Sequence, residues 1–395
     1  MMNPIELRDL LIDWANINSG SSHLAGLARM SAALRAEFAT LPGAKIEEVA
    51  LPGTTARALR IRIRPEAEHQ VLLSGHYDTV YDADHPFQVC TFMAPDILRG
   101  PGVADMKGGL VIMLAALREF EASVDAMRLG WEILLTPDEE TGSVASAALL
   151  AATAPRFAFA LVFEPARANG DLIKSRMGTG IFTVTVHGHA AHAGRDRASG
   201  RNAVLALGEL LPGIDEINRD LEGVMLNVAR IRGGNAVNIV PDLAEVDLGV
   251  RITRPDDELA VLDCLRGLAE TINSRQGYRA IVTGRFNRPP KIVTPAEDAL
   301  FALWKNCARE LGVTLDWQHV AGGSDGSLLS AAGLPNLDGL GPVGEHLHSP
   351  DEYIRLSSLV ERARIAARFL TGIARGEILI PPRLASGPAA PKSTG

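Results

Sequence analysis

Short apolar runs that each end at a histidine or an acidic residue recur along this chain. Three of them are VLLSG before His76, WEILLT before Pro-Asp-Glu139-Glu140, and FAFALVF before Glu164. Runs of this length and composition are typical of parallel strands that are buried on both faces. We therefore predict an α/β fold with a mixed, largely parallel sheet flanked by helices.

The polar residues at the strand exits are expected to meet at one edge of the sheet. In open α/β sheets, ligands bind in the crevice outside the carboxyl ends of the strands. Asp105 fits the same place, because GPGVADMKGG is a glycine-rich loop that runs into an apolar helix expected from Leu110 to about Phe120. His348 follows the strand-like run LPNLDGL and a Gly/Pro loop.

These residue types are suited to holding two divalent cations. Two cations about 3.5–4 Å apart need a shared anionic bridge, with nitrogen and oxygen ligands on each. One aspartate as the bridge, with a histidine and a glutamate on each metal, meets that need. Asp78 lies two residues after His76 and can turn back to orient it. Glu139 and Glu140 can divide the tasks of metal ligand and general base.

Each residue also has a structural interpretation without function. The His-x-Asp pair can be a surface turn, and the Glu139-Glu140 pair can cap a helix that starts near Ser143. Glu164 can end a strand, and Asp105 can be a turn residue. The functional interpretation is favoured because all of them occur together, in order, at strand exits.

The motifs that carry these residues resemble those of a known enzyme family. They are GHYDTV, GPGVADMKGG, TPDEETGS, VFEP and HSPDEY. Between about Leu7 and about Ile373 the chain is similar to the zinc-dependent exopeptidases and deacylases. That family includes glutamate carboxypeptidase, acetylornithine deacetylase, succinyl-diaminopimelate desuccinylase and aminoacylase. The GTGIF and HAAHAG segments look closest to the glutamate carboxypeptidase branch.

The resemblance implies two zinc ions, which cobalt or manganese can replace, and a role for each residue of the site. One zinc would be held by His76, Asp105 and Glu164, and the other by Asp105, Glu140 and His348. Glu139 would be the general base, and Asp78 would orient His76. The peptide bond between Asp105 and Met106 would be cis.

Composition agrees with a soluble two-domain enzyme. At 395 residues, the chain exceeds the size at which single cores stop growing. No apolar run reaches the length of a membrane span, and the N-terminus resembles an amphipathic helix more than a signal peptide. The three cysteines are scattered, as is typical of a reducing compartment. We therefore expect a cytoplasmic protein without membrane association.

Other classes of protein are disfavoured. A net charge of −8 without strong basic runs speaks against nucleic-acid binding. A two-metal phosphoesterase would call for a more basic pocket, and GPGVADMKGG lacks the GxGxxG spacing of a dinucleotide fold. A catalytically silent binding homologue would be expected to have lost a ligand or Glu139, and all of them are present.

The middle of the chain predicts a separate inserted domain. From Met177 the pattern reads β-α-β-β-α-β, the order of a ferredoxin-like module. We expect a catalytic domain at 1–176 and 287–395, with an inserted domain at 177–286 and a mobile tail from about residue 380. The resemblance implies that the inserted domain is a lid that pairs two subunits into a homodimer.

The inserted domain and its surroundings supply candidate substrate-binding residues. By resemblance, His192 would steady the oxyanion in the partner subunit's site. Asn238 and Arg288 would grip a terminal carboxylate, for which a guanidinium fork is suited; Arg285 is the alternative to Arg288. Gly323 lies in a GGSD loop that would line the specificity pocket, although Ser324 or Asp325 could simply cap a helix there.

The predicted substrate is a small peptide or an N-acyl amino acid. Lys174 falls near the place where glutamate carboxypeptidase binds the side chain of a C-terminal glutamate, and an ordinary surface lysine is the alternative. The main interpretation is a carboxypeptidase that releases a C-terminal amino acid such as glutamate. The alternative is an N-acyl-amino-acid deacylase.

Overall fold

The computed structural model describes residues 3–381, and nearly all of the predicted mobile tail lies outside the described residues. The chain divides into two compact units. Unit 1 comprises the chain up to residue 175 together with 293–320 and the part from 324 on, whereas unit 2 comprises 176–292 and 321–323. No helix among residues 3–381 is long and apolar enough to cross a membrane.

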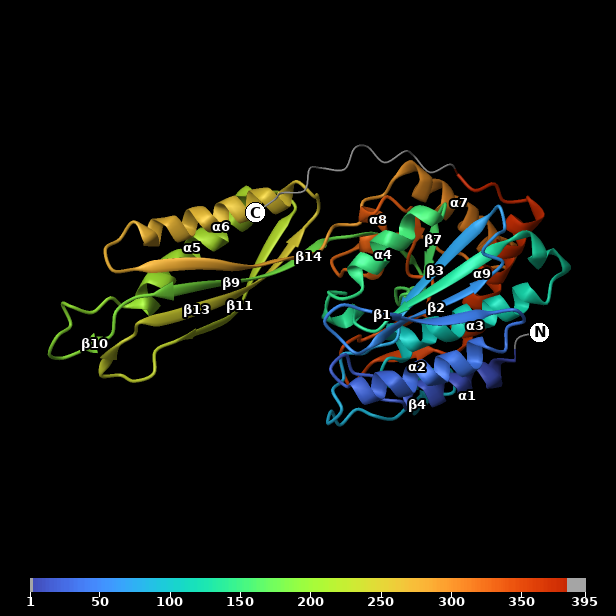
Figure 1. Ribbon diagram of the computed structural model, residues 1–395, viewed down its shortest axis with the longest axis horizontal. Helices are drawn as coiled ribbons and strands as arrows, with labels where there is room; N and C mark the ends of the chain where they lie inside the picture. Colours follow the sequence, from blue (N-terminus) through green and yellow to red (C-terminus); the bar gives the residue numbers. More distant parts are fainter. Residues whose placement is uncertain (1–2, 382–395) are drawn as a thin grey trace. The chain divides into compact units, whose positions relative to one another are not determined.

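Unit 1 is built on a six-stranded mixed sheet (Figure 1). Its strands, in spatial order, are β1 (Lys45–Ala50), β2 (Arg57–Ile63), β6 (Gly130–Thr136), β3 (Gln70–His76), β7 (Ala160–Val162) and β16 (Asn336–Leu337). The pairs from β6 to β16 are parallel, and those from β1 to β6 are antiparallel. The predicted α/β fold with a largely parallel sheet is therefore confirmed.

Helices cover both faces of this sheet. Successive side chains of a strand point to opposite faces, and apolar side chains on both faces have to be buried. On β3, Val71 and Leu73 pack into the larger core and Leu72 packs into the smaller one. The larger core is closed by α1 (Pro4–Ala15), α2 (Leu24–Phe38), α3 (Gly108–Glu121), α7 (Pro295–Glu310) and α9 (Ser357–Arg375). The smaller core is closed by α4 (Ala147–Thr153) and α8 (Asp325–Ala331) (Figure 1).

Two smaller sheets complete unit 1. One contains β17 (Gly344–Glu345), β18 (Tyr353–Arg355), β5 (Ile97–Arg99) and β4 (Thr91–Ala94), and the other pairs β15 (Trp317–Val320) with β8 (Leu172–Arg176). In the first of them, β18 runs antiparallel to β5, with Tyr353 opposite Arg99. This pairing brings the segment that follows His348 next to the loop that carries Asp105.

Unit 2 has the predicted β-α-β-β-α-β order. Its four-stranded antiparallel sheet, in spatial order, contains β11 (Val224–Gly233), β13 (Leu243–Ile252), β9 (Gly178–His187) and β14 (Arg279–Arg288), and its helices are α5 (Ala203–Asp220) and α6 (Asp257–Asn273) (Figure 1). Phe182, Val184 and Val186 of β9 face a core shared with both helices. On the other face, Thr183 donates a hydrogen bond to Asp247, as expected for a sheet with one polar side.

The boundary of unit 2 differs from the one predicted at residue 286. Unit 2 continues to Ile292 because Arg176 and Lys291 exchange backbone hydrogen bonds of 3.2 and 2.9 Å. The segment 321–323 also belongs to unit 2, since the Arg176 guanidinium donates to the carbonyl of Gly322 at 3.1 Å. These contacts join residues far apart in the sequence, so the hydrophobic pattern does not reveal them.

Candidate metal centre

Three parallel strands deliver acidic and histidine side chains to one edge of the unit 1 sheet. His76 is the last residue of β3, and Glu164 follows β7. Glu139 and Glu140 open the short 3₁₀ helix Glu139–Thr141, which follows β6. Because β3 lies between β6 and β7, the three strand ends converge there. The expected helix near Ser143 begins only at Ala147, so the glutamate pair lies in a separate turn before it.

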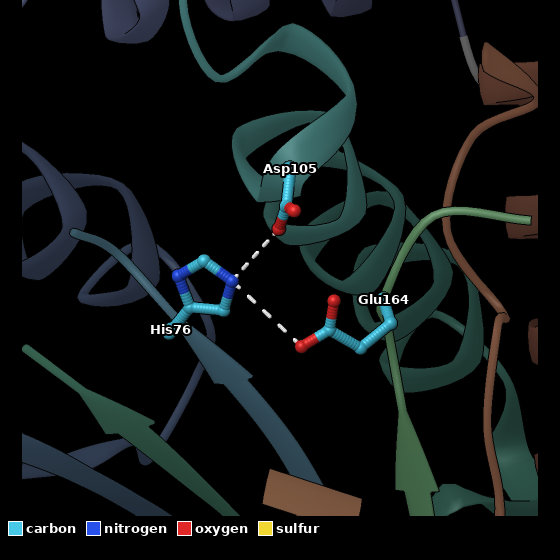
Figure 2. Close-up of side chains that lie close together, drawn as sticks. All are labelled: His76, Asp105 and Glu164. Carbon is cyan, nitrogen blue, oxygen red and sulfur yellow. Dashed lines mark hydrogen bonds and ion pairs between the residues drawn. The ribbon is translucent and has the colours of Figure 1, made fainter. Parts of the chain in front are cut away.

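Asp105 lies between two groups of potential metal ligands. It precedes α3, and its peptide bond to Met106 is cis. Its Oδ1 lies 2.9 Å from His76 Nε2, and its Oδ2 lies 3.4 Å from His348 Nε2. Figure 2 shows His76 pointing toward both Asp105 and Glu164, whose Oε1 lies 3.7 Å from the same ring nitrogen. Each oxygen of Asp105 therefore faces a different histidine.

The second group is completed by Glu140, whose Oε2 lies 3.0 Å from His348 Nε2. His76, Asp105 and Glu164 form one potential metal-binding group, and Asp105, Glu140 and His348 form the other. Within each group the potential ligand atoms all lie within 4.8 Å of one another. The groups share Asp105 alone, which is the arrangement of a bridging carboxylate.

The titration behaviour of these groups fits a site for cations. Burial and the nearby Asp105 raise the pKa of Glu140 to about 8. Although burial opposes it, hydrogen bonds from His348 and His76 hold the pKa of Asp105 well below its usual range. Hydrogen bonds to Asp105 and Glu140 raise the pKa of His348 to about 11. Protons bound in this cluster offset the repulsion between its carboxylates. Divalent cations could take the place of these protons, and the histidines would then be neutral ligands.

Asp78 contacts one residue from each of the two groups of potential ligands, His76 and Glu140. Its Oδ1 lies 3.3 Å from His76 Nδ1, and its backbone carbonyl lies 3.1 Å from the same nitrogen. Its carboxylate also accepts the backbone N–H groups of Glu139 and Glu140, both at 3.1 Å, and the hydroxyl of Ser21 at 2.7 Å. The predicted contact with His76 is present, and the contacts that hold the glutamate turn were not predicted.

Glu352 is a second carboxylate whose place in the site was not predicted. It is 1% exposed and accepts backbone N–H groups from the loop that carries Asp105. The only signal in the sequence is its position in HSPDEY, four residues after His348.

His192 and Asn238 lie close together in unit 2. His192 belongs to β10 (Ala191–His192), which pairs with β12 (Ile239–Val240), and the N–H of Ala193 donates to the carbonyl of Asn238 at 2.9 Å. His192 is exposed, and its Nδ1 accepts the N–H of Gly194 at 3.1 Å. A neutral imidazole with this hydrogen bond carries its proton on Nε2.

Arg288 and Gly323 are also neighbours in unit 2. Arg288 is 4% exposed at the end of β14, whereas Arg285 is exposed. A register shift of β14 between Phe286 and Arg288 separates the two arginines. A Cβ atom at Gly323 would lie 2.4 Å from Arg288 Cδ, so the glycine packs directly against the arginine stem.

Lys174 lies in unit 1, on β8. Its Nζ is 4.9 Å from the centroid of the Trp317 ring on the neighbouring strand β15. A lysine over an aromatic face is held by a cation–π interaction. The ammonium group is therefore positioned by Trp317.

The chain belongs to peptidase family M20/M25/M40, whose model matches residues 72–372. It is therefore a metallopeptidase or amidohydrolase, and the family recognised from the sequence motifs is confirmed. Carboxypeptidase G2 of Pseudomonas sp. (strain RS-16) is 28% identical over 375 residues, covering 92% of this chain and 88% of that protein. Succinyl-diaminopimelate desuccinylase of Acidovorax ebreus (strain TPSY) is 30% identical over 285 residues, covering 69% and 71%.

Solved structures share the fold. An M20 family metallo-carboxypeptidase from Sulfolobus solfataricus matches with a TM-score of 0.77 and 16% identity, covering 94% of this chain and 99% of that one. A dinuclear metal-binding M20 peptidase of Bacillus subtilis matches with a TM-score of 0.68 and 15% identity, covering 94% and 98%. At this level of identity the likeness concerns the fold alone.

Proposed function

We propose that this protein is a di-zinc hydrolase that cleaves an amide bond next to a free carboxylate. Its proposed reaction is that of a carboxypeptidase releasing a C-terminal amino acid such as glutamate. The observation that carries the proposal is the position of Asp105, whose two oxygens face two separate groups of potential ligands. Similarity to carboxypeptidase G2 over nearly the whole chain supports the choice of reaction.

His76, Asp105 and Glu164 would hold one zinc ion, and Asp105, Glu140 and His348 the other. When bound, such a pair of ions activates a water molecule as the nucleophile and polarises the carbonyl oxygen of the substrate. Cobalt or manganese can take the same ligands.

Glu139 is the proposed general base and acid. It is 9% exposed, and its backbone N–H is held by Asp78, which fixes the start of the turn. Its carboxylate would take a proton from the attacking water and pass it to the leaving amine. Neighbouring Glu140 faces His348, which supports the proposed division in which Glu139 is the base and Glu140 a metal ligand.

Four residues of unit 2 are proposed to contact the substrate. The buried Arg288, with Asn238, would bind the free carboxylate of the substrate through its guanidinium fork. His192, with its proton on Nε2, would donate a hydrogen bond to the oxyanion in the site of a second subunit. Because His192 would act in the site of a second subunit, we propose a homodimer through unit 2. Gly323 would line the substrate pocket.

An N-acyl-amino-acid deacylase is the second candidate. It is supported by the similarity to succinyl-diaminopimelate desuccinylase. Both reactions break an amide next to a free carboxylate. They differ in the acyl part of the substrate, which is a peptidyl group for a carboxypeptidase and a simple acyl group for a deacylase.

A hydrolysis panel would test the proposal. It would contain dipeptides and N-acyl amino acids varied at the C-terminal residue, together with phosphate esters, each assayed with added zinc or cobalt and again after chelation. We expect metal-dependent cleavage of the amides, with the highest kcat/KM for a C-terminal glutamate. Cleavage of phosphate esters alone, or of no substrate in the panel, would contradict the proposal.

Lys174 is the proposed contact for the side-chain carboxylate of a C-terminal glutamate. We expect Lys174→Met to lower kcat/KM for C-terminal glutamate substrates and to leave the value for C-terminal alanine unchanged. An equal change for both would mean that Lys174 serves only the packing of β8 against Trp317.

A further inference from the structure

Glu352 lies immediately before β18, in the segment that also carries His348. It is 1% exposed, although a glutamate is rarely buried unless its oxygens are well paired. Three of the four groups that donate to its carboxylate come from a different part of the chain, the loop around Asp105. The reason for its burial therefore lies in that loop.

Both oxygens of Glu352 are saturated by donors. Oε1 accepts the backbone N–H groups of Ala104 at 2.8 Å and Asp105 at 3.1 Å. Oε2 accepts the N–H of Gly102 at 3.1 Å and the hydroxyl of Tyr81 at 2.8 Å. Gly102 has a φ of +71°, a left-handed conformation that glycine adopts without strain. The loop is thus curled around the carboxylate.

A carboxylate with three backbone N–H groups and one hydroxyl holds its partners by strong, charge-assisted hydrogen bonds. One further contact joins the same segments, because the N–H of Gly100 donates to the carbonyl of Glu352 at 3.1 Å. The Tyr81 hydroxyl, from another part of the chain, also lies 2.8 Å from the carbonyl of Ser349. The loop of Asp105 is therefore tied to the segment of His348 at several points.

We propose that Glu352 is a positioning residue of the metal centre, which sets where the Asp105 carboxylate lies relative to His348. The proposal rests on the proposed function, in which Asp105 is the ligand shared by both metals. The side chain of Asp105 faces His76 and His348, while its backbone N–H is held by Glu352. Asp78 holds the turn of Glu139 and Glu140 in a comparable way.

The test is the substitution Glu352→Gln, which keeps the size of the side chain. An amide nitrogen cannot accept a hydrogen bond, so at least one backbone N–H of the loop loses its acceptor. We expect both metal ions to bind roughly 10–100-fold more weakly, the range typical when a partner of a metal ligand is removed. The readouts are chelator competition and the visible absorption spectrum of the cobalt-loaded protein, both recorded well below the unfolding temperature.

Glu297→Gln is the matched control. Glu297 is also 1% exposed and also accepts backbone N–H groups from two segments, Thr294 at 2.8 Å and Asn336 at 3.3 Å. It lies at the start of α7, outside both groups of potential ligands. We expect this variant to be less stable than the wild type but to bind metal with the same affinity and the same cobalt spectrum.

Tyr81→Phe is a milder test that removes the hydroxyl donor to Glu352, together with its contact to the carbonyl of Ser349, and leaves all three backbone donors in place. We expect a smaller loss of metal affinity in the same direction, and this variant decides the question if Glu352→Gln does not fold. The proposal is overturned if the folded variants bind two ions as tightly as the wild type with an unchanged cobalt spectrum. Failure of the wild type to bind two ions would instead refute the proposed function.

Discussion

Asp105 and Asp78 show how single carboxylates organise this site. Asp105 directs one oxygen to each histidine, and Asp78 joins His76 to the turn of the two glutamates. Removing either would affect several other side chains at once. Glu139 differs from them, because its proposed role is to move protons.

We expect Glu139→Gln to bind two metal ions and to lose roughly 10²–10⁴-fold in kcat, the contribution typical of general acid–base catalysis. The amide has the size of the carboxylate but cannot accept the proton. Steady-state kinetics on the best substrate of the panel, together with metal analysis, would check this. Near-wild-type turnover would show that another group is the base.

The stability of the metal-free protein is expected to fall as pH rises. The pKa of Glu140 is raised from 4.5 to about 8, and that of His348 from 6.5 to about 11. For each group, the lower pKa is that of the unfolded state and the higher pKa is that of the folded state. Between these two values the folded state binds more protons than the unfolded state, so the free energy of unfolding decreases with pH. Urea denaturation after chelation, at about pH 5 and about pH 9, would measure the effect.

Glu140→Gln provides the control for that pH dependence. It removes the contribution of Glu140, so the decrease between about pH 5 and about pH 8 should become smaller. A metal-free protein that gains stability over this range would contradict the protonated state of the cluster.

The strands and loops that carry the site were largely predictable from sequence. Buried apolar runs with polar residues at their ends identify β3, β6 and β7 and the edge where they meet. The limits of strands were less predictable: β7 covers only Ala160–Val162, although Phe157 and Phe163 are also buried. An apolar run in the sequence indicates which residues are buried. The end of a strand is instead set by where its backbone stops pairing with the neighbouring strand.

The short segment before α8 gives a further prediction. A methyl group at Gly323 would collide with the stem of Arg288, whereas one at Gly322 would meet open space. We expect Gly323→Ala to raise KM through displacement of the guanidinium, with a smaller effect on kcat, and Gly322→Ala to leave both unchanged. Equal kinetics of the two variants would argue against Arg288 as the carboxylate contact.

The division of the whole molecule was predictable in outline, because a β-α-β-β-α-β pattern interrupts the run of catalytic motifs. The hydrogen bonds of Glu352 and the contact between Arg176 and Lys291 were not predictable, since they join loops distant in sequence. The residue type shows that a glutamate can accept hydrogen bonds. It does not show which backbone N–H groups will donate them.

A homodimer with shared sites predicts complementation between two inactive variants. Glu139→Gln and His192→Gln should each have low activity alone. After subunit exchange, a mixed dimer would contain one site with both residues intact, and an equal mixture should recover about a quarter of wild-type activity. Absence of recovery, with exchange demonstrated by labelled subunits, would contradict a role of His192 in the partner's site.

The most direct test of the metal centre is the number of zinc ions bound per chain, measured for the wild type and for Asp105→Ala after chelation and reloading. If Asp105 is the shared ligand, the wild type binds two ions, and the variant loses affinity for both because each group loses a ligand. A folded Asp105→Ala protein that still binds two zinc ions as tightly as the wild type would contradict the bridging role and the function built on it.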